Sequence, residues 1–410
     1  MSNKLLIGAL SLLIAVPAAF GQEKLVKQVE RMAKKDDVNV QEARNFLKPA
    51  FENPETANDA KTWWVAGLIE EQQVKRDYLQ LSLGKEINQD TFYKAVADMT
   101  DYYMKADSLD RLPNEKGKVK QHFDKKISES LATYYGFLVN GGAAAMDGGD
   151  VCKAHDLFQK FMDVKKMELF QGTPTAEQDS MSMQIGFFNA YTLTQCNKDD
   201  KQGAIAAYEA IKDVPFRQND VYQLLAQSYV QAGDTAGFLR TLDEGIKLFP
   251  EENFYLFNKI NILIQEGRHE DAKAYLDQAI SANPDNKQLY FVLANVYEQG
   301  FKDMAKAEEA FNKALAIDPE YAEAMLGLGR VYFNQGANIQ SEANAITDEA
   351  QYKAKVDEAK VFFQKALPYF EKAVELNPDD TQYLVALRGI YYNLGMNDKY
   401  NEIDQRIQNK

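Results

Sequence analysis

The chain is poor in the side chains that most often perform catalysis or bind metals. Among its 410 residues are only two cysteines and three histidines. The histidines, His122, His155 and His269, do not form a His-x-x-x-His pair, and the sequence contains neither a phosphate-binding glycine-rich loop nor a nucleophile elbow. We therefore expect no enzyme, no cofactor and no metal site.

Basic residues are also in the minority. Lysine and arginine total 47 against 61 aspartate and glutamate residues, which gives a net charge of −14. The sequence has no Lys/Arg cluster of the phosphate-binding kind, so it does not predict nucleic-acid binding, and anionic membrane surfaces would repel the chain. The hydrophobic content of 45% is sufficient for a large folded core.

Long apolar runs are missing beyond the N-terminus. Residues 1–21 combine a positive charge at Lys4 with an apolar stretch at 5–16 that is too short to span a bilayer comfortably. Small residues flank Phe20, as signal peptidase requires. We predict a cleavable signal peptide with Gln22 as the first mature residue, and an uncleaved N-terminal anchor is the alternative. Because no cysteine follows the apolar stretch, lipoprotein processing is not expected.

What the chain does contain is an internal repeat. Residues 287–319 place apolar side chains at i, i+3, i+4 and i+7, which is one face of a helix, and start a second helical face after Gly300. Residues 253–284 and 219–250 follow the same plan. The prolines that end the three units lie 34 and 35 residues apart, at Pro250, Pro284 and Pro319.

Small residues explain how the two helices of one repeat pack. Ala294, Ala307 and Ala314 let antiparallel helices approach closely, and aromatic side chains fill the space beside them. We expect glycine at the turn that ends the first helix, and proline at the start of the next repeat, where its missing N–H costs nothing. Each helix pair has an apolar face that it cannot bury alone, so the pairs must stack.

This pattern resembles the tetratricopeptide repeat family, and residues 219–336 and 366–395 carry the resemblance best. The resemblance implies an all-α solenoid of about eight or nine antiparallel helical hairpins in a right-handed superhelix. We expect irregular hairpins over residues 22–215 and regular repeats over 216–410. No strand pattern competes with this interpretation.

Several segments interrupt the regular pattern. In the repeat that follows Pro319, the pattern of the first helix runs to Gly336. A helical insertion near 337–365 is expected to lengthen both helices of this hairpin, so that they project from the stack. Pro368 should kink the second of them. A capping hairpin is expected at 381–410. We expect the glycine-rich stretch 140–150 to be a flexible turn.

The two cysteines, Cys152 and Cys196, would lie in an oxidising compartment if the chain is exported. Each falls at the turn or start of the second helix in successive hairpins. A disulfide requires Cα atoms within about 7 Å, which ideal neighbouring repeats exceed, but the irregular turns here could close that gap. A disulfide and two free thiols are both open. Cys152 and His155, beside Asp147 and Asp150, could also form a metal cluster, but helix-capping aspartates explain this pattern better.

A row of amide side chains recurs at the repeat period. In the superhelix that the resemblance implies, the first helix of each pair lines a concave groove. The residue after each small packing residue should point into that groove, beside an apolar row four residues earlier. Amides can donate to and accept from a peptide backbone, and aromatic rings can bury peptide side chains. The predicted peptide-binding residues are Gln223, Gln227, Phe257, Asn258, Asn261, Phe291, Asn295 and Arg330.

These residues also have a simpler explanation. Asn and Gln are common on polar surfaces, and Phe257 and Phe291 could pack between repeats. The Lys-rich clamp with which some tetratricopeptide proteins hold a terminal carboxylate is absent, apart from Arg330. As the one cation in the row, Arg330 could orient an acidic residue of a ligand.

The sequence therefore predicts a non-enzymatic, exported scaffold that binds a protein or peptide partner. From the resemblance to exported bacterial tetratricopeptide proteins, we expect it in the envelope of a Gram-negative bacterium, in the periplasm. The alternative is a carbohydrate- or ligand-binding module that uses Trp63, Trp64 and tyrosine-rich faces for stacking. Trp63 argues against this alternative because it falls at a packing position of a repeat.

Overall fold

The computed structural model describes residues 20–113 and 116–409. Within these residues all regular secondary structure is helical and no strand occurs, so the all-α prediction is confirmed. The predicted signal peptide, 1–21, lies outside the described residues except for its last two. The chain divides into two compact units, residues 1–238 (unit 1) and 239–410 (unit 2), and each is described by itself.

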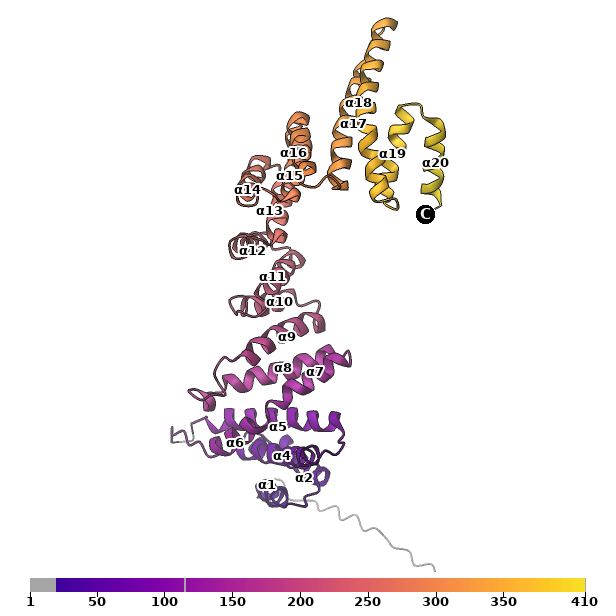
Figure 1. The fold of residues 1–410 in the computed structure, drawn as a ribbon. Helices are drawn as coiled ribbons and strands as arrows, with labels where there is room; N and C mark the ends of the chain where they lie inside the picture. Colours follow the sequence, from indigo (N-terminus) through magenta and orange to yellow (C-terminus); the bar gives the residue numbers. More distant parts are fainter. Residues whose placement is uncertain (1–19, 114–115, 410) are drawn as a thin grey trace, which may run out of the picture. The chain divides into compact units, whose positions relative to one another are not determined.

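Unit 1 is a stack of helical hairpins with irregular connections (Figure 1). Its helices are α1 (Phe20–Ala33), α2 (Val40–Glu52), α3 (Pro54–Ala57), α4 (Ala60–Ser82), α5 (Gln89–Asp110), α6 (Asp124–Tyr134), α7 (Phe137–Asp147), α8 (Val151–Lys166), the 3-10 helix η1 (Glu168–Phe170), α9 (Ser180–Cys196), α10 (Lys201–Glu209) and α11 (Gln218–Ala232). Neighbours in sequence pack together, as α1 with α2, α4 with α5, and α7 with α8. The division between the units falls within α12 (Thr235–Leu248).

Unit 2 contains shorter connections and more uniform hairpins. Its further helices are α13 (Asn253–Gln265), α14 (His269–Ala282), α15 (Lys287–Asn295), the π-helix η2 (Val296–Phe301), α16 (Met304–Ile317), α17 (Ala322–Ala343), α18 (Glu349–Leu376), α19 (Thr381–Asn393) and α20 (Asn397–Gln408). The pairs α13–α14, α15–α16, α17–α18 and α19–α20 are antiparallel hairpins, and each packs on the next.

Polar residues before the first turn explain where many helices begin. Asn39, Asn88 and Asp150 each accept a hydrogen bond from a backbone N–H in the first turn of α2, α5 and α8. Asp303 does the same for α16 in unit 2. Asp179 forms a reciprocal capping box with Ser182 at the start of α9. These side chains satisfy backbone groups that a helix cannot pair internally.

Glycines inside helices allow close helix crossings in both units. A Cβ atom added to Gly67 of α4 would lie 2.3 Å from the ring of Tyr103 on α5. In unit 2, a Cβ atom on Gly327 of α17 would lie 2.4 Å from the Phe311 ring of α16. Such short distances mean that no larger residue fits without displacement of the ring.

The expected flexible turn at 140–150 is wrong. Residues 137–147 form α7, and Gly142 lies so close to α8 that an added Cβ would be 2.4 Å from the Phe158 ring. The glycines therefore serve helix packing, and the chain turns only after them, where Gly149 takes a φ of +79°.

In the turns of unit 2, one glycine and one proline have roles other than those expected. Lys302, and not Gly300, adopts the left-handed conformation after the first helix of its repeat, with φ of 57°. Pro284 lies in the turn between the end of α14 at Ala282 and the start of α15 at Lys287. The proline thus follows the second helix of a repeat, and it does not occupy the first position of the next helix.

The π-helix η2 accounts for the unequal repeat lengths. Pro250 and Pro284 are 34 residues apart, whereas Pro284 and Pro319 are 35 apart (319 − 284). The π-helical segment Val296–Phe301 lies within this longer unit. A π-turn takes one residue more than an α-turn, so it absorbs the extra residue without disturbing the packing on either side.

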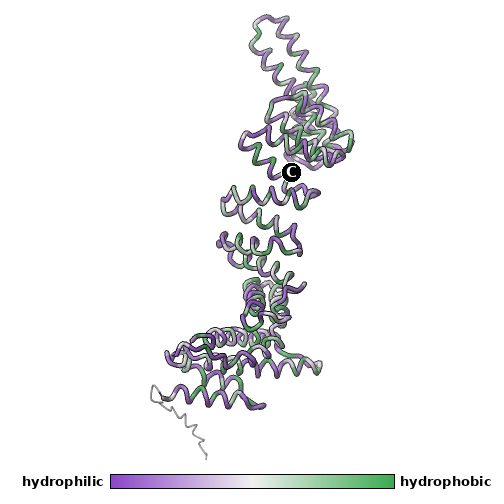
Figure 2. Tube along the Cα trace, turned by 90° about the vertical axis from the view of Figure 1, so that its left-hand side faces the viewer, coloured by the Kyte–Doolittle hydropathy of each residue, from purple (hydrophilic) through white to green (hydrophobic). Residues whose placement is uncertain are grey.

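The hairpin α17–α18 is the longest of unit 2, with helices of 22 and 28 residues. Figure 1 shows that its tip extends beyond the ends of α16 and α19. Gly336 lies inside α17, and α18 continues on both sides of Pro368. Hydrophobic and hydrophilic residues alternate along the helices (Figure 2), as expected for helices that bury one face.

Candidate binding surface

The eight predicted groove residues fall in both units and are described in two parts. Gln223 and Gln227 lie on α11 of unit 1. The six residues of unit 2 lie on first helices of successive hairpins, and we call them the amide face. They are Phe257, Asn258 and Asn261 on α13, Phe291 and Asn295 on α15, and Arg330 on α17.

Arg330 is held by side chains of its own chain. Its Nε and Nη2 atoms donate to the two carboxylate oxygens of Glu298 at 2.8 and 2.6 Å, and Nη2 also donates to Oδ1 of Asn295 at 2.9 Å. Glu298 is only 4% exposed and also accepts from Asn334. The guanidinium therefore neutralises a buried carboxylate, and this pairing does not favour the expectation that Arg330 orients an acidic ligand residue.

Glu298 and Asn334 are members of this network that the sequence interpretation missed. Glu298 lies three residues after Asn295, and Asn334 four residues after Arg330. Residues at these spacings share a helix face, so the i, i+3 and i, i+4 rule was the signal that could have found them. The π-helical turn that carries Glu298 was not visible in the sequence.

Asn261 presents the freest amide of the amide face. Its side chain is exposed and has no hydrogen-bond partner among the described residues. Asn258, in contrast, donates to the Phe254 carbonyl of its own helix at 2.8 Å. Asn295 keeps its amide N–H groups available, since Arg330 uses only its oxygen. Asn261 therefore has its whole amide available for a partner and Asn295 both of its amide N–H groups, whereas one N–H of Asn258 is already engaged.

The aromatic residues of the amide face are half-buried. Phe257 and Phe291 pack against the core of unit 2, and the Phe291 ring lies 5.9 Å from that of Phe311 and 5.5 Å from that of Tyr321. They thus pack within the repeats, as the simpler explanation proposed, and keep part of each side chain at the surface. A partner would find an apolar strip beside the amides.

Charges fix the connection between two first helices of unit 2. The ammonium of Lys287 on α15 lies 4.6 Å from the Tyr321 ring centre and is bonded to Asp318. The hydrogen bond from Lys287 lowers the pKa of the Asp318 carboxyl. Burial raises the pKa of Tyr321 to about 12, so the phenol is neutral at physiological pH. This pairing orients the start of α17 relative to α15.

Gln227 lines a polar hollow of about 300 Å³ in unit 1, between α9, α10 and α11. Three further amides, Gln195, Asn197 and Gln231, contribute to the same hollow and were not predicted. Gln195 and Asn197 come from the end of α9 and the turn after it, outside the repeat pattern. Gln231 lies on α11 four residues after Gln227, and this spacing could have marked it. Gln223 is half-buried and donates to Asn219 at 3.4 Å.

The tryptophans do not form a stacking platform. Trp63 packs against Phe51, with ring centres 4.9 Å apart, and its indole N–H donates to the Ala57 carbonyl. Trp64 is 3% exposed and stacks on Phe123. A sugar ring requires an open aromatic face, so this geometry does not favour the carbohydrate-binding alternative.

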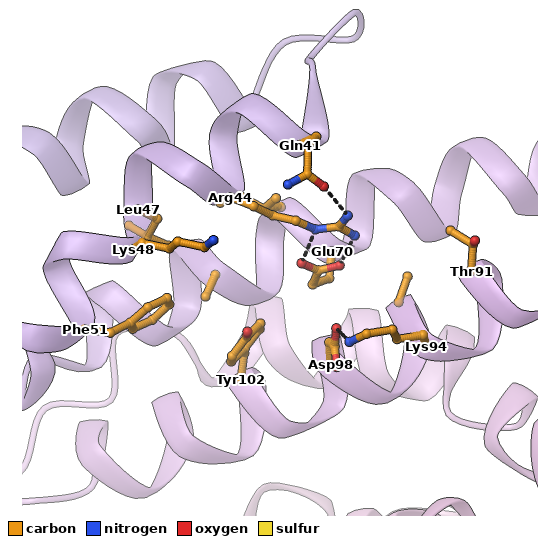
Figure 3. A pocket seen from close by; sticks show the side chains of 13 residues that line it. Gln41, Arg44, Leu47, Lys48, Phe51, Glu70, Thr91, Lys94, Asp98 and Tyr102 are labelled. Carbon is orange, nitrogen blue, oxygen red and sulfur yellow. Dashed lines mark hydrogen bonds and ion pairs between the residues drawn. The ribbon is translucent and has the colours of Figure 1, made fainter. Parts of the chain in front are cut away.

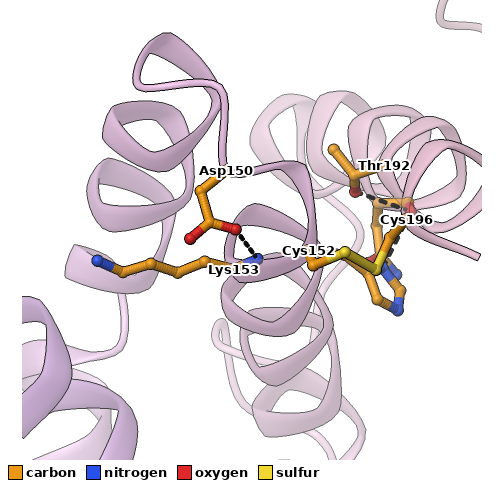
Figure 4. The surroundings of a disulfide bond; sticks show 7 residues. Asp150, Cys152, Lys153, Thr192 and Cys196 are labelled. Atoms are coloured by element: carbon orange, nitrogen blue, oxygen red, sulfur yellow. Dashed lines mark hydrogen bonds between the residues drawn. A yellow bond between two sulfur atoms is a disulfide. The ribbon is translucent and has the colours of Figure 1, made fainter.

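Cys152 and Cys196 form a disulfide, with Cα atoms 4.9 Å apart (Figure 4). The bond joins the first turn of α8 to the last residue of α9, two helices that pack directly against each other. Because Cys152 is oxidised, it cannot serve as a thiolate ligand. Asp150 caps α8 by accepting from the Lys153 N–H, and the described residues contain no group of three or more metal-ligating side chains.

Among residues 20–113 and 116–409, no helix combines the length and the apolar character that a membrane span requires.

Comparison with known proteins identifies the repeats. Residues 257–322 match the family model described as tetratricopeptide repeat, and residues 300–391 match that of the plant-specific mitochondrial import receptor subunit TOM20. The TPR repeat-containing protein YpiA of Bacillus subtilis is 28% identical over 173 residues, or 38% of this chain. The chain spans about two fifths (39%) of the length of this curated relative. Proteins with such repeats generally mediate protein–protein interactions and are generally non-enzymatic.

Solved structures of other repeat proteins are similar at low identity. A crystal structure of MamA is 20% identical with a TM-score of 0.33, and the match covers 49% of this chain and 94% of MamA. A TPR repeats protein from Bacteroides fragilis is 17% identical with a TM-score of 0.31, covering 63% of this chain and 98% of that one. Neither similarity says what this chain binds.

Proposed function

This chain carries tetratricopeptide repeats, and from that premise we propose that it is a non-enzymatic scaffold that binds a protein or peptide partner on the amide face of unit 2. The observation that carries the proposal is the exposed, unpartnered amide of Asn261 beside the half-buried Phe257 four residues earlier. One turn of α13 thus offers both hydrogen bonds for a peptide backbone and apolar surface for a side chain.

The neighbouring first helix extends this surface. Asn295 is held in position by Arg330, which leaves its N–H groups directed away from the acceptor contact. An amide whose rotamer is already fixed loses less entropy when it binds a ligand. Arg330 and Glu298 therefore support the binding surface by orienting Asn295, and they do not contact the partner's charges in this proposal.

The proposal includes the location. Export to the periplasm of a Gram-negative bacterium is supported by the N-terminal sequence 1–21 and by the Cys152–Cys196 disulfide, since disulfides persist in oxidising compartments. Cell fractionation of the full-length protein tests this part, and recovery in the cytoplasm with an intact N-terminus would refute it.

The binding part is tested with a partner captured by crosslinking in intact cells. Asn261→Ala removes one amide from the face and should weaken binding about fivefold. Asn261→Ala with Asn295→Ala should weaken it about tenfold or more. Isothermal titration measures both affinities, and circular dichroism checks that the helical signal is unchanged.

A matched control uses the outer helix of the same repeat. Glu309→Ala with Lys313→Ala removes an exposed i, i+4 ion pair on α16 and should leave the affinity unchanged. Glu308 is unsuitable for this purpose because it accepts a hydrogen bond from the Tyr332 hydroxyl at 2.6 Å. Equal losses from the inner and outer pairs, or no loss from the inner pair, would show that the amide face is not the site.

A further inference from the structure

Unit 1 has a hollow of about 330 Å³ between α2, α4 and α5 (Figure 3). Its floor consists of buried apolar residues of all three helices, Leu47, Ala66, Ile69 and Ala95. Its rim carries exposed polar side chains, among them Gln41, Lys48, Thr91 and Lys94. An apolar floor inside a polar rim is the usual build of a binding site, and the volume lies at the lower end of the range for ligand pockets.

The charges in the hollow leave one cation without a partner. Arg44 donates from Nε and Nη2 to the carboxylate of the buried Glu70 at 2.8 and 2.5 Å, so these two charges neutralise each other. Lys94 is paired with Asp98. Lys48 makes no ion pair or hydrogen bond with any described residue. The hollow therefore has a net positive charge on a chain whose net charge is −14.

An aromatic wall faces this cation. The rings of Phe51 and Tyr102 are stacked at 6.0 Å, and Trp63 packs behind both of them. Figure 3 shows the Lys48 ammonium and the Tyr102 hydroxyl directed into the same space. The hydroxyl has no hydrogen-bond partner among the described residues, and burial raises the pKa of Tyr102, so it stays a neutral donor.

We propose that this hollow is a second binding site, which takes an acidic residue and an adjacent apolar residue of a partner peptide. The carboxylate accepts from the Lys48 ammonium and the Tyr102 hydroxyl, and the apolar side chain lies against Phe51 and the floor. A cationic ligand is excluded because Glu70 and Asp98 are already paired. This site is separate from the proposed amide face, and either proposal can be refuted while the other holds.

The test uses a synthetic peptide, acetyl-Gly-Glu-Phe-Glu-Leu-Gly-amide, whose blocked ends leave only side-chain carboxylates charged. Trp63 and Trp64 are the only tryptophans of the chain, and Trp63 forms the back of the aromatic wall. Intrinsic tryptophan fluorescence of the full-length protein therefore includes a signal from a residue that packs against the aromatic wall of the hollow. We expect saturable binding in the micromolar to submillimolar range that weakens as salt is added.

Two matched comparisons decide the result. Lys48→Gln should weaken binding about tenfold, whereas Lys24→Gln, which removes an exposed lysine of α1 outside the hollow, should have no effect. The same peptide with glutamine in place of both glutamates should bind about tenfold more weakly. Asn261→Ala should leave this binding unchanged, which separates it from the amide face.

The proposal is overturned if the glutamine peptide binds as well as the glutamate peptide, or if Lys48→Gln and Lys24→Gln lower the affinity for the glutamate peptide equally. Absence of a saturable signal up to about 1 mM peptide would overturn it as well. Circular dichroism of Lys48→Gln checks that a loss of binding is not caused by misfolding, which is not expected because this lysine is exposed.

Discussion

Units 1 and 2 build the same kind of hairpin stack with different interactions. In unit 2 the helices meet through alanines, glycines and aromatic rings at a nearly constant period. Unit 1, in contrast, contains most of the chain's described buried polar side chains. Glu70, Glu71, Asp107 and Asp110 are examples, each with a specific partner.

The difference explains why only part of the chain shows a repeat. Packing between small and aromatic residues works in the same way in every repeat, so the same residue types return at the same spacing. A buried ion pair or a disulfide works at one place only, and the sequence around it carries no period. Unit 1 therefore adds to its hydrophobic core individual bonds that a search for periodicity does not detect.

Loss of the disulfide should have the largest effect of the changes considered, and it should affect unit 1 but not unit 2. Cys152 and Cys196 are 44 residues apart in sequence, and closing a loop of that size corresponds to about 4 kcal/mol in the chain-entropy description. Reduction, or Cys152→Ser with Cys196→Ser, should accelerate amide hydrogen exchange in α8 and α9 and leave α13 to α20 unchanged. Exchange that rises equally in both units, or in neither, would contradict a local role. The double serine variant should not respond to reductant.

The two units are alike in one respect, since each contains an arginine paired with a buried glutamate. Arg44→Ala leaves the buried Glu70 without its guanidinium, and Arg330→Ala does the same to Glu298. Each change should lower the free energy of unfolding by about 2–3 kcal/mol, since both guanidinium groups are partly solvated. Urea denaturation measures the loss.

A matched replacement separates the buried charge from lost packing. Arg44→Met with Glu70→Leu removes both charges and should recover most of the stability. If Arg44→Ala costs nothing, or if the double replacement is worse than the single one, the buried pair is not the reason for the loss.

The smallest expected effect concerns pH. The Ser182 backbone N–H, and secondarily its hydroxyl and Lys165, lower the pKa of Asp179 below its ordinary value of 3.8. Because the folded pKa is the lower one, the stabilisation is present above about pH 4 and is lost as the pH falls through the folded pKa. Asp179→Asn should lower the urea midpoint at pH 7 and approach the parent protein near about pH 3. An equal difference at both pH values would contradict this.

The sequence predicted the class and the regular part of the fold for a physical reason. Pro250, Pro284 and Pro319 mark helix ends, and the small residues between them mark helix crossings. The sequence did not show whether each proline lies in the turn or at the first position of the next helix, because these two places are only two or three residues apart. The glycines of 140–150 were misinterpreted because Gly permits both turns and close packing.

The binding surfaces were less predictable than the fold. Periodicity correctly placed the amide residues on first helices of unit 2, but it could not reveal that Glu298 holds Arg330, because this ion pair joins two different repeats. The hollow of unit 1 combines Lys48, Glu70 and Tyr102, which lie on three different helices, α2, α4 and α5. Such a site depends on how the helices pack, which no local pattern in the sequence records.

The most direct test of the central claim is site-specific photo-crosslinking in intact cells. A photoreactive phenylalanine analogue is placed at position 261 on the amide face or at position 313 on the outer helix of unit 2, both of which are exposed. We predict a discrete covalent adduct with a partner protein from position 261 and none from position 313. Adducts of equal yield from both positions, or from position 313 alone, would contradict the assignment of partner binding to the amide face.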